Sequence, residues 1–502
     1  MEKRLIVAIT LSILVLLVWS AFTPKNPLPK PAAQVTNIGI STVKEVTPAE
    51  TIPLLPVMPP VLFKNDTIQV EFIEHTASVN RVIFDKYRSH KFQLGNGFAL
   101  LLDKLSFKKQ FASATDIIFV HKDENKEITK HFIFHKSDYS IDLEINVQNL
   151  TNASLDIELP VEVGFIDLKS LGGQARYEDF VVGLAEKTLH LNGQKEGVYE
   201  NVKFAAIRDR YFCAILGSPS EDYSVRIKKI DAQKTSIILA GKKTIEPGKS
   251  FVQKFRIYLG PQDLQAIQSI NFAWGSIINF GTFDIISQLL LKLLAFFHGV
   301  LHSWGWAIVL LSIAIYLILF PLTLKQMKSM KAMQALQPRI AELKKLYSKD
   351  NPQKFHKETL ELYKEHKVNP FGGCLPLLLQ MPIFFALYQA LIRSVSLKGS
   401  SFLWIKDLSE PDHLFTMPFT LPVLGNQFNI LPILMAVLMF FQQKSTMASA
   451  GSENAEQQKI MMIVFPIMFG FIFYTMPAGL VLYWFVNSVL TVIYQIKVTR
   501  SK

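Results

Sequence analysis

The chain has 502 residues, of which 49% are hydrophobic and 19% are charged, and its mean hydropathy is +0.24. This combination indicates membrane-spanning segments, and the length leaves room for two or three domains. The formal net charge of +12 is compatible with nucleic acid, anionic lipid or membrane topology, so the position of the charges has to decide. The two cysteines, Cys213 and Cys374, fall in unlike regions, which argues against a structural disulfide.

The first apolar run, from Leu5 to Phe22, is about as long as the hydrocarbon core of a bilayer requires. Lys3 and Arg4 precede it, so we expect the N-terminus to lie in the cytoplasm. A cleaved signal peptide is the alternative, but the run is long for one and ends in a poor small-residue cleavage site. We therefore predict an uncleaved transmembrane anchor over residues 1–23.

Residues 24–60 contain nine prolines and few packing residues, which is typical of a linker. After it, apolar and polar residues alternate, most clearly over 139–148. The same period recurs at Thr67–Phe72, Ile128–Phe134, Tyr223–Ile230 and Phe251–Leu259, with turn signals at Asn96-Gly97, Gly172-Gly173 and Pro247-Gly248. We predict a β-sandwich domain over 61–265, on the outer side of the membrane, which is the periplasm in a bacterium with two membranes.

Two motifs in this domain resemble chemical sites. His131 and His135 look like a pair of metal ligands, but on a strand they would lie about 13 Å apart, too far to share one ion. The run 248–250, Gly-Lys-Ser, looks like the end of a phosphate-binding loop, yet Lys243 replaces the first glycine and no helix pattern follows. We expect surface residues in both places and predict neither a metal nor a cofactor.

The C-terminal part carries the remaining apolar segments. The run 283–297 has four polar interruptions, so we predict an amphipathic interfacial helix over 279–300. The predicted spans that follow are Trp304–Phe320, Cys374–Leu391, Phe428–Phe441, Ile460–Thr475 and Leu480–Ile496. With the anchor they make six transmembrane helices, five of which form a core over 301–502.

Half of the net charge lies in one segment, 324–372, which has ten lysines and one arginine against five acidic residues. A cytoplasmic N-terminus places this segment in the cytoplasm too, in agreement with the positive-inside rule. Apolar residues recur every three or four positions up to Tyr347, Pro338 should bend that helix, and Asn351-Pro352 is typical of a second helix start. We predict a basic helical hairpin over 322–371.

The apolar stripe of this hairpin has two interpretations. It either packs the two helices together or offers an adaptable surface to emerging apolar segments or a partner protein. In the second case the residues that meet the substrate are Met327, Met330, Met333, Lys344 and Lys345.

Three segments resemble a known family. They are PLTLKQMKSMKAMQALQPRI (321–340), NPFGGCLPLLLQMPIFFALY (369–388) and PAGLVLYWFVNSVLTVIYQ (477–495). Their order and spacing resemble the YidC/Oxa family of membrane protein insertases, and the N-terminal anchor with a large outer domain resembles its Gram-negative branch. The resemblance implies an inner-membrane insertase and chaperone, not an enzyme, with a periplasmic β-supersandwich. It also implies nascent membrane proteins, lipids and the Sec translocon as partners, with a ribosome and a targeting receptor as further candidates.

The family resemblance further implies a hydrophilic groove within the membrane, and polar residues in the predicted spans favour it independently. The last span carries polar residues at four-residue intervals, at Tyr483, Asn487, Thr491 and Gln495. The predicted groove residues are Ser312, Tyr316, Gln380, Tyr483, Trp484 and Asn487. The alternative is that these side chains only join helices by buried hydrogen bonds.

One residue departs from the family pattern. The family usually carries an arginine four residues after the Ser or Thr of the second span, where this chain has Tyr316 after Ser312. Arg393 cannot replace that charge, because it lies thirteen residues beyond Gln380, about 20 Å along a helix. We therefore predict a polar but uncharged groove.

Two other functions remain open on the sequence. A transporter should carry ionisable residues in its spans, and no Asp or Glu occurs in any of the six. An enzyme acting on sugars through the β-domain would need paired carboxylates, for which Glu74, Glu178 and Asp179 are candidates. We expect no DNA partner, since the basic surplus follows membrane topology.

Overall fold

The computed structural model describes residues 60–136, 138–167, 178–347, 352–366, 368, 375–421, 425–447 and 455–500. The predicted anchor, the predicted linker up to residue 59, the turn at Gly172-Gly173, Asn351 and Cys374 lie outside these residues.

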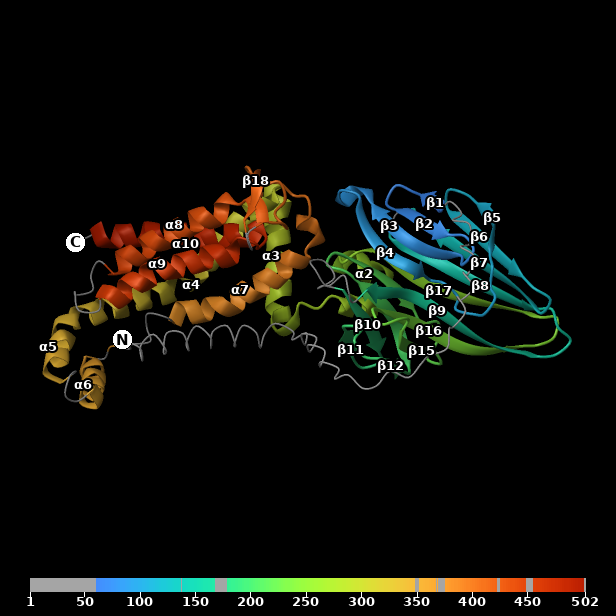
Figure 1. The fold of residues 1–502 in the computed structure, drawn as a ribbon, viewed down its shortest axis with the longest axis horizontal. Helices are drawn as coiled ribbons and strands as arrows, with labels where there is room; N and C mark the ends of the chain where they lie inside the picture. The colour runs from blue at the N-terminus through green and yellow to red at the C-terminus, as the bar shows by residue number, and fades with distance from the viewer. Residues whose placement is uncertain are drawn as a thin grey trace, which may run out of the picture. The chain divides into compact units, whose positions relative to one another are not determined.

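The first described part is built of antiparallel strands (Figure 1). They are β1 (Val61–Lys64), β2 (Gln69–Ile73), β3 (Ser78–Phe84), β4 (His90–Gly97), β5 (Lys108–Ala112), β6 (Asp116–Lys122), β7 (Lys126–Phe134), β8 (Ser140–Asn149), β9 (Leu155–Asp167), β10 (Asp179–Leu184), β11 (Thr188–Leu191), β12 (Gly197–Tyr199), β13 (Val202–Arg208), β14 (Phe212–Gly217), β15 (Ser224–Lys229), β16 (Lys234–Ile245) and β17 (Ser250–Pro261). A nine-stranded sheet has the order β11-β10-β13-β14-β17-β8-β7-β6-β5, and two four-stranded sheets have the orders β1-β2-β3-β4 and β12-β15-β16-β9.

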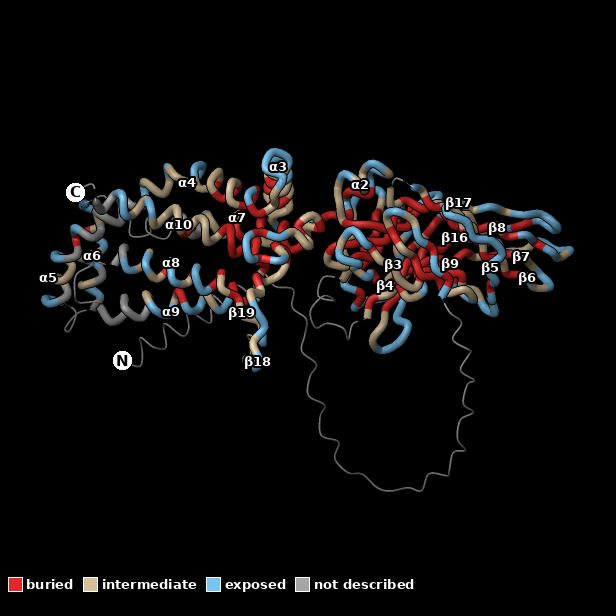
Figure 2. The backbone as a smooth tube through the Cα atoms, turned by 90° about the horizontal axis from the view of Figure 1, so that it is seen from above, coloured by how far each residue is buried: buried red, intermediate tan, exposed pale blue. Residues whose placement is uncertain are grey.

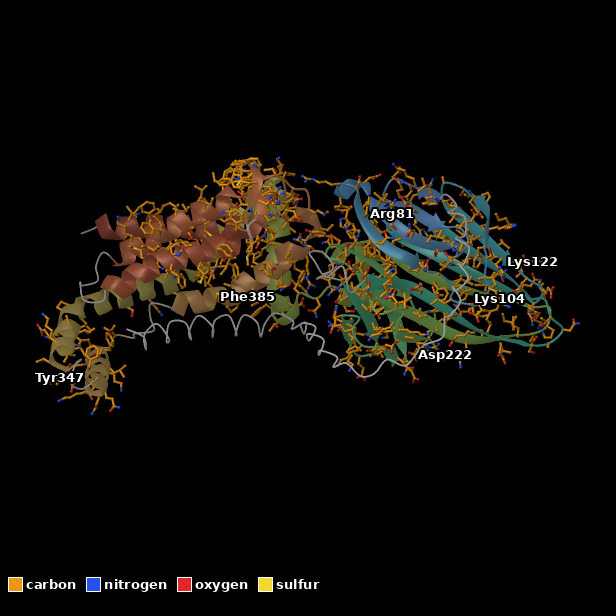
Figure 3. All side chains as sticks on the ribbon, in the orientation of Figure 1. Arg81, Lys104, Lys122, Asp222, Tyr347 and Phe385 are labelled. Atoms are coloured by element: carbon orange, nitrogen blue, oxygen red, sulfur yellow. The ribbon has the colours of Figure 1, made fainter. Side chains whose placement is uncertain are left out.

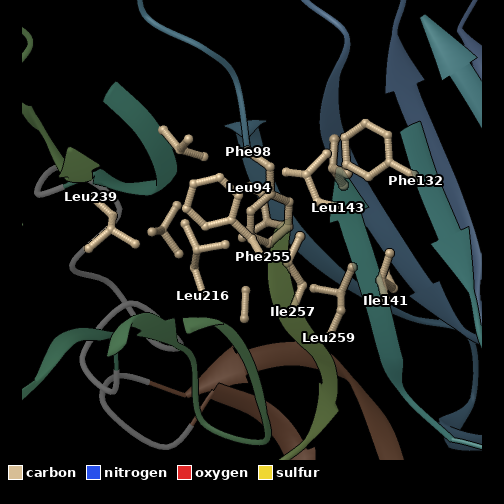
Figure 4. Packing of buried hydrophobic residues seen from close by; sticks show 14 of the residues in the cluster. Leu94, Phe98, Phe132, Ile141, Leu143, Leu216, Leu239, Phe255, Ile257 and Leu259 are labelled. Carbon is tan, nitrogen blue, oxygen red and sulfur yellow. The ribbon is translucent and has the colours of Figure 1, made fainter. Parts of the chain in front are cut away.

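The three sheets share one hydrophobic core. Leu94 of β4, Leu143 of β8 and Leu239 of β16 come from different sheets, and all three are fully buried in it (Figure 4). The alternation over 139–148 explains how β8 contributes, because its apolar side chains point to the core and its polar ones away from it. The predicted β-sandwich is confirmed, with more strands than the sequence pattern showed.

One predicted turn is displaced. Asn96-Gly97 was expected to turn the chain, but β4 continues through Gly97, which pairs with Val79. The turn closes one residue later, where the Ala99 amide donates to the Asn96 carbonyl at 2.9 Å and Phe98 adopts a φ of 61°. The predicted turn at Pro247-Gly248 is confirmed between β16 and β17.

A lysine inside the β-core holds this turn. Lys130 of β7 is fully buried, and its ammonium donates to the carbonyls of Ala77 at 2.5 Å and Phe98 at 2.6 Å. Both acceptor residues have positive φ, which costs energy for side chains with a Cβ. The rings of Phe107 and Phe132 lie 5.8 and 5.3 Å from the ammonium. Burial lowers the pKa of Lys130 to about 7.

This lysine makes the stability of the β-domain depend on pH. Between pH 7 and the ordinary lysine value of 10.5, the unfolded chain binds the Lys130 proton and the folded chain does not, so the unfolding free energy rises with pH. The rise should be several kcal/mol, because each tenfold difference in proton affinity corresponds to about 1.4 kcal/mol. The unfolding free energy is measured by denaturing the full chain at pH values from 7 to 10 and following the spectroscopic signal of its β-sheets.

Lys130→Met should flatten this pH dependence, whereas Lys228→Met, at an exposed lysine of β15, should leave it unchanged. Equal slopes in the two variants would show that Lys130 keeps its proton in the folded protein.

The second described part is mainly helical. Its elements are α2 (Leu264–Ile270), η3 (Phe272–Ile277), η4 (Gly281–Phe283), α3 (Asp284–Leu301), α4 (Trp304–Ala335), α5 (Gln337–Tyr347), α6 (Pro352–Glu365), α7 (Leu375–Arg393), η6 (Val395–Leu397), β18 (Phe415–Leu421), β19 (Gly425–Phe428), α8 (Ile430–Met447), α9 (Ala455–Phe473) and α10 (Ala478–Arg500). Leu311 of α4, Leu387 of α7, Met435 of α8 and Leu480 of α10 are buried at the centre of one apolar cluster.

Three of the described helices are long and apolar enough to cross a membrane: 281–301, 304–325 and 478–497. The apolar parts of α8 and α9, 430–444 and 462–473, are shorter. Figure 1 shows α3 running across the end of α4 and α7–α10, which lie alongside one another. This course is compatible with the predicted interfacial helix, although the length of α3 also suits a span.

Helix α4 differs from the prediction. The span was expected to end at Phe320 and the hairpin to begin at 322, but α4 continues without a break to Ala335. Pro321 removes one backbone donor, and the helix tolerates this loss as transmembrane helices do. The helix ends just before Leu336, next to Pro338, where the proline predicted a bend.

The hairpin beyond α4 has a small core of its own. Leu336, Leu362 and Val368 are buried there, and Ile340 and Leu343 pack against them. This part of the apolar stripe therefore joins α5 to α6. The side chains of Met327, Met330, Met333 and Lys344 lie outside the described residues, and Lys345 is exposed.

Arginines of the β-domain bind carbonyls at the end of α7 and in the segment between α7 and α8. Arg88 donates to the carbonyls of Gly399 at 3.1 Å and Lys406 at 2.9 Å. Arg210 donates to the carbonyls of Ile392 at 2.7 Å and Ser409 at 2.9 Å. Guanidinium groups suit this role because their several donors are held in a fixed plane.

Candidate functional site

Helix α10 supplies half of the predicted groove residues and packs against α4, α7 and α8. Tyr483 is fully buried, and the side-chain amide of Gln380 on α7 donates to its hydroxyl. One turn later the Asn487 amide donates to the Tyr483 carbonyl at 2.8 Å, and the Thr491 hydroxyl donates to the Asn487 carbonyl at 2.8 Å. The polar side chains of α10 are therefore satisfied largely by its own backbone.

Helix α4 meets the same face of α10 at a different level. The Tyr316 hydroxyl donates to the Leu490 carbonyl at 3.4 Å. Leu490 lies seven residues beyond Tyr483, about 10 Å along the helix. Gln380 and Tyr316 thus contact α10 two turns apart and do not meet at one point. We call Tyr316, Gln380, Tyr483, Asn487 and Thr491 the polar track.

The predicted groove residues differ in how far they are exposed. Tyr316, Gln380 and Asn487 are partly exposed. Ser312 is fully buried, and its hydroxyl donates to the Ile308 carbonyl of its own helix at 2.7 Å. Arg393 is placed far from the track, with its guanidinium donating to the Asn279 carbonyl at 3.1 Å.

Trp484 has a different environment from its neighbour Tyr483. Its ring lies among three phenylalanine rings, with centroids 5.3 Å from Phe384, 5.9 Å from Phe469 and 5.4 Å from Phe473. These contacts join α7, α9 and α10 through an aromatic cluster. Trp484 therefore packs in an aromatic cluster, whereas Tyr483 beside it takes part in the hydrogen bonds of the polar track.

Sequence reasoning missed one buried polar contact. Ser287 of α3 is fully buried, and its hydroxyl donates to the Ala386 carbonyl of α7 at 2.9 Å. It had counted as a polar interruption of an amphipathic surface. Leu290 and Leu294 share its buried face at helical spacing, and that period is the signal that places Ser287 inside. Nearby lies Phe385, which Figure 3 labels among the helices. Its ring stacks on that of Phe283, with centroids 6.3 Å apart.

The histidines of the β-domain contact separate carboxylates. His131 lies 2.9 Å from Asp116, and His135 lies 3.0 Å from Asp142. Lys249 forms an exposed ion pair with Glu246 in the turn before β17. Among the described residues, no group of three potential metal ligands comes together.

The candidate carboxylates of a sugar enzyme do not share a site. Glu74 accepts the Lys109 amide at 2.9 Å, and Asp179 forms a two-pronged pair with Arg208. Burial raises the pKa of Glu178 to about 7, with a further contribution from nearby acidic residues. Asp179 is thus committed to a structural ion pair.

Comparison with known proteins decides the family. The family described as "60Kd inner membrane protein" matches residues 296–502, and "YidC periplasmic domain" matches residues 105–293. "Membrane protein insertase YidC" of Pelobacter propionicus is 30% identical over 550 residues, covering 100% of this chain and 99% of that protein. The chain belongs to the YidC family of membrane protein insertases.

Other relatives of the YidC family agree. The protein of the same name from Geotalea uraniireducens is 29% identical over 549 residues, covering 100% of this chain and 99% of that protein. A crystal structure of an active YidC insertase with its first transmembrane domain resolved has a TM-score of 0.42 and 18% identity, covering 88% of this chain and 93% of that one. The family matches and the relatives by sequence confirm the predicted family resemblance.

The hydrogen bond between Gln380 and Tyr483 should couple α7 to α10. We expect a double-mutant cycle of Gln380→Ala and Tyr483→Phe to give a coupling energy of about 0.6 kcal/mol, and at most about 1.7 kcal/mol, as buried bonds between membrane helices do. Reversible unfolding of the full chain in mixed micelles measures it. Gln380→Ala with Thr491→Val is the matched control, because Thr491 bonds within α10 and should be additive. Additivity in both pairs would contradict the contact.

Proposed function

We propose that this chain inserts membrane proteins and helps them to fold by letting their polar flanks pass along the polar track. The observation that carries the proposal is the partial exposure of Tyr316, Gln380 and Asn487 on otherwise apolar helices. Half-buried polar side chains of this kind keep water within reach of a passing segment and lower its cost of desolvation.

The reaction needs no bond chemistry. As apolar substrate residues leave the track for lipid, each Å² of apolar surface removed from water contributes about 25 cal/mol. The track has only to lower the barrier for the polar flank, which hydroxyl and amide groups do by exchanging hydrogen bonds with it. Insertion without catalysis is therefore sufficient, and no cofactor takes part.

In our proposal the helical hairpin of α5 and α6 lies in the cytoplasm and meets the emerging segment first. Leu346 and Leu360 are exposed on its surface, 64% and 54%, beside its lysines. Exposed apolar side chains can bind apolar segments, and the basic residues around them attract anionic lipid headgroups. We propose that the helical hairpin and the helices of the core also bind partner proteins, namely the Sec translocon, the ribosome and a targeting receptor.

We also propose the topology that accompanies this function. Residues 1–23 form an anchor with a cytoplasmic N-terminus, 24–60 a linker, 61–265 a periplasmic domain, and 279–300 an interfacial helix before the core of 301–502. The basic surplus over 324–372 supports this orientation.

The missing arginine defines the chemistry of the track. Tyr316 offers a hydroxyl but no charge, so an acidic substrate tail gains a hydrogen bond without a charge-assisted one. We propose that this insertase accepts uncharged polar flanks as well as acidic ones, with little dependence on salt.

Removing the polar groups should impair insertion. We expect Tyr316→Leu to lower the insertion rate of a small single-span substrate moderately. The double variant Tyr316→Leu with Gln380→Leu should lower the rate several-fold, because the track then lacks polar groups at both levels for hydrogen bonding to water or to the substrate. Proteoliposomes with a protease-protection readout measure the rate. Thr323→Val, whose hydroxyl bonds within α4, is the control and should insert normally.

An unchanged insertion rate in the double variant, at equal protein content, would show that substrates do not pass along the polar track. Tyr316→Arg gives a second check, because it should raise insertion of acidic-tailed substrates and make that gain sensitive to salt.

A further inference from the structure

The segment between α7 and α8 contains a two-stranded hairpin, β18–β19, that no role described so far uses. Phe415 pairs with Phe428 and Thr416 with Gln427, and the Phe415 and Phe428 rings stack at 4.8 Å. Phe415 and Phe419 are nonetheless 52% and 58% exposed. Residues 413–429 contain no Asp, Glu, Lys or Arg. An uncharged strand with exposed aromatic residues calls for an apolar or interfacial environment.

The base of this hairpin is held firmly by the helices. The Asp412 carboxylate accepts the amides of Ile430 and Leu431, each at 2.9 Å, and so caps α8. Asn429 accepts the His413 amide at 3.0 Å and donates to the Tyr474 carbonyl at 2.7 Å. These contacts fix the direction in which the hairpin leaves the core.

Tyr474 makes a further contact with the hairpin, since its hydroxyl donates to the Gln427 carbonyl of β19 at 2.8 Å. Strand β19 is therefore tied to the end of α9 as well as to α8. Phe415 and Phe419 are therefore exposed on a hairpin that hydrogen bonds hold in place.

The position of the hairpin matches a membrane interface. The Trp404 ring nitrogen donates to Asp412 at 3.3 Å, and Leu403 beside it is 72% exposed. Tryptophan is enriched where helices leave the hydrocarbon. Figure 2 shows β18 projecting sideways from the end of α8 and α9, across the direction of these helices. A hairpin with that course lies along the plane of a membrane that the helices cross.

The apolar surface also continues onto the helix that the hairpin leads into. Ile433 and Val437 of α8 are exposed along the first turns after the hairpin. In a chain that spans a membrane, such side chains face lipid. The hairpin extends that lipid-facing surface beyond the end of α8.

The backbone of β18 disfavours a protein partner that would add a strand. Pro418 has no amide to donate, and the register shifts between Thr416 and Leu421. Both features block strand addition at a sheet edge. The outer edges of the hairpin carry backbone N–H and C=O groups without a strand partner. Each such group costs several kcal/mol in the hydrocarbon core, so the hairpin does not lie there, but the hydrated headgroup region satisfies these groups.

We propose that the β18–β19 hairpin binds the lipid surface, with Phe415 and Phe419 at the boundary between headgroups and acyl chains of the leaflet at this end of the helices. It holds the outer end of α8 and α9 at a constant depth. This role is independent of the polar track.

The full chain in phospholipid vesicles tests the proposal. A polarity-sensitive NBD label at Phe419→Cys should emit to the blue of its position in water and be quenched several-fold more by phospholipids carrying a nitroxide near the headgroup than by unlabelled lipid. Val198→Cys is the matched control, since Val198 is an exposed apolar residue (65%) on β12 of the β-domain. Its label should stay unquenched. The parent chain gives the background of Cys213 and Cys374.

Two results would overturn the proposal. One is a label at residue 419 that behaves like the label at residue 198. The other is shielding without nitroxide quenching that disappears as the protein is diluted with lipid, which assigns the surface to a second copy of the chain. An unchanged melting temperature of Phe419→Cys confirms that the fold is intact in either case.

Discussion

Helix α10 sets the main constraint on the helical core, because it carries polar side chains through an apolar cluster and still contacts α4, α7, α8 and α9. Asn487 and Thr491 bond to its own backbone, so they need no partner from a neighbouring helix. Gln380 and Tyr316 add hydrogen bonds to α10 from two other helices, at two levels. The internal hydrogen bonds of α10 do not depend on these outer contacts.

The two sides of α10 divide the work between them. The aromatic cluster around Trp484 joins α10 to α7 and α9 through ring contacts. On the polar track, Gln380 of α7 and Tyr316 of α4 contact α10 through hydrogen bonds. In the proposed function, the modest strength of such bonds between membrane helices lets the track release a substrate that stronger contacts would retain.

Local periodicity predicted those parts of the fold that depend on local pattern. The alternation before Val147 predicted β8, and Pro352 predicted where α6 begins. Contacts between residues far apart in the sequence could not be predicted, because no spacing shows that Lys130 reaches Phe98 or that Arg210 binds Ser409. At the site, the four-residue interval found the stripe on α10, but only packing could separate Trp484 from Tyr483.

The unbroken course of α4 has a mechanical consequence. Its 32 residues form a rod of about 48 Å, longer than the hydrocarbon core, with Tyr316 near its middle and the hairpin of α5 and α6 at its end. Because α4 is continuous from Tyr316 to Ala335, these two residues lie about 28 Å apart along one helix. The polar track and the base of the hairpin are thereby held at a set spacing, which a break in the helix at Pro321 would have left variable.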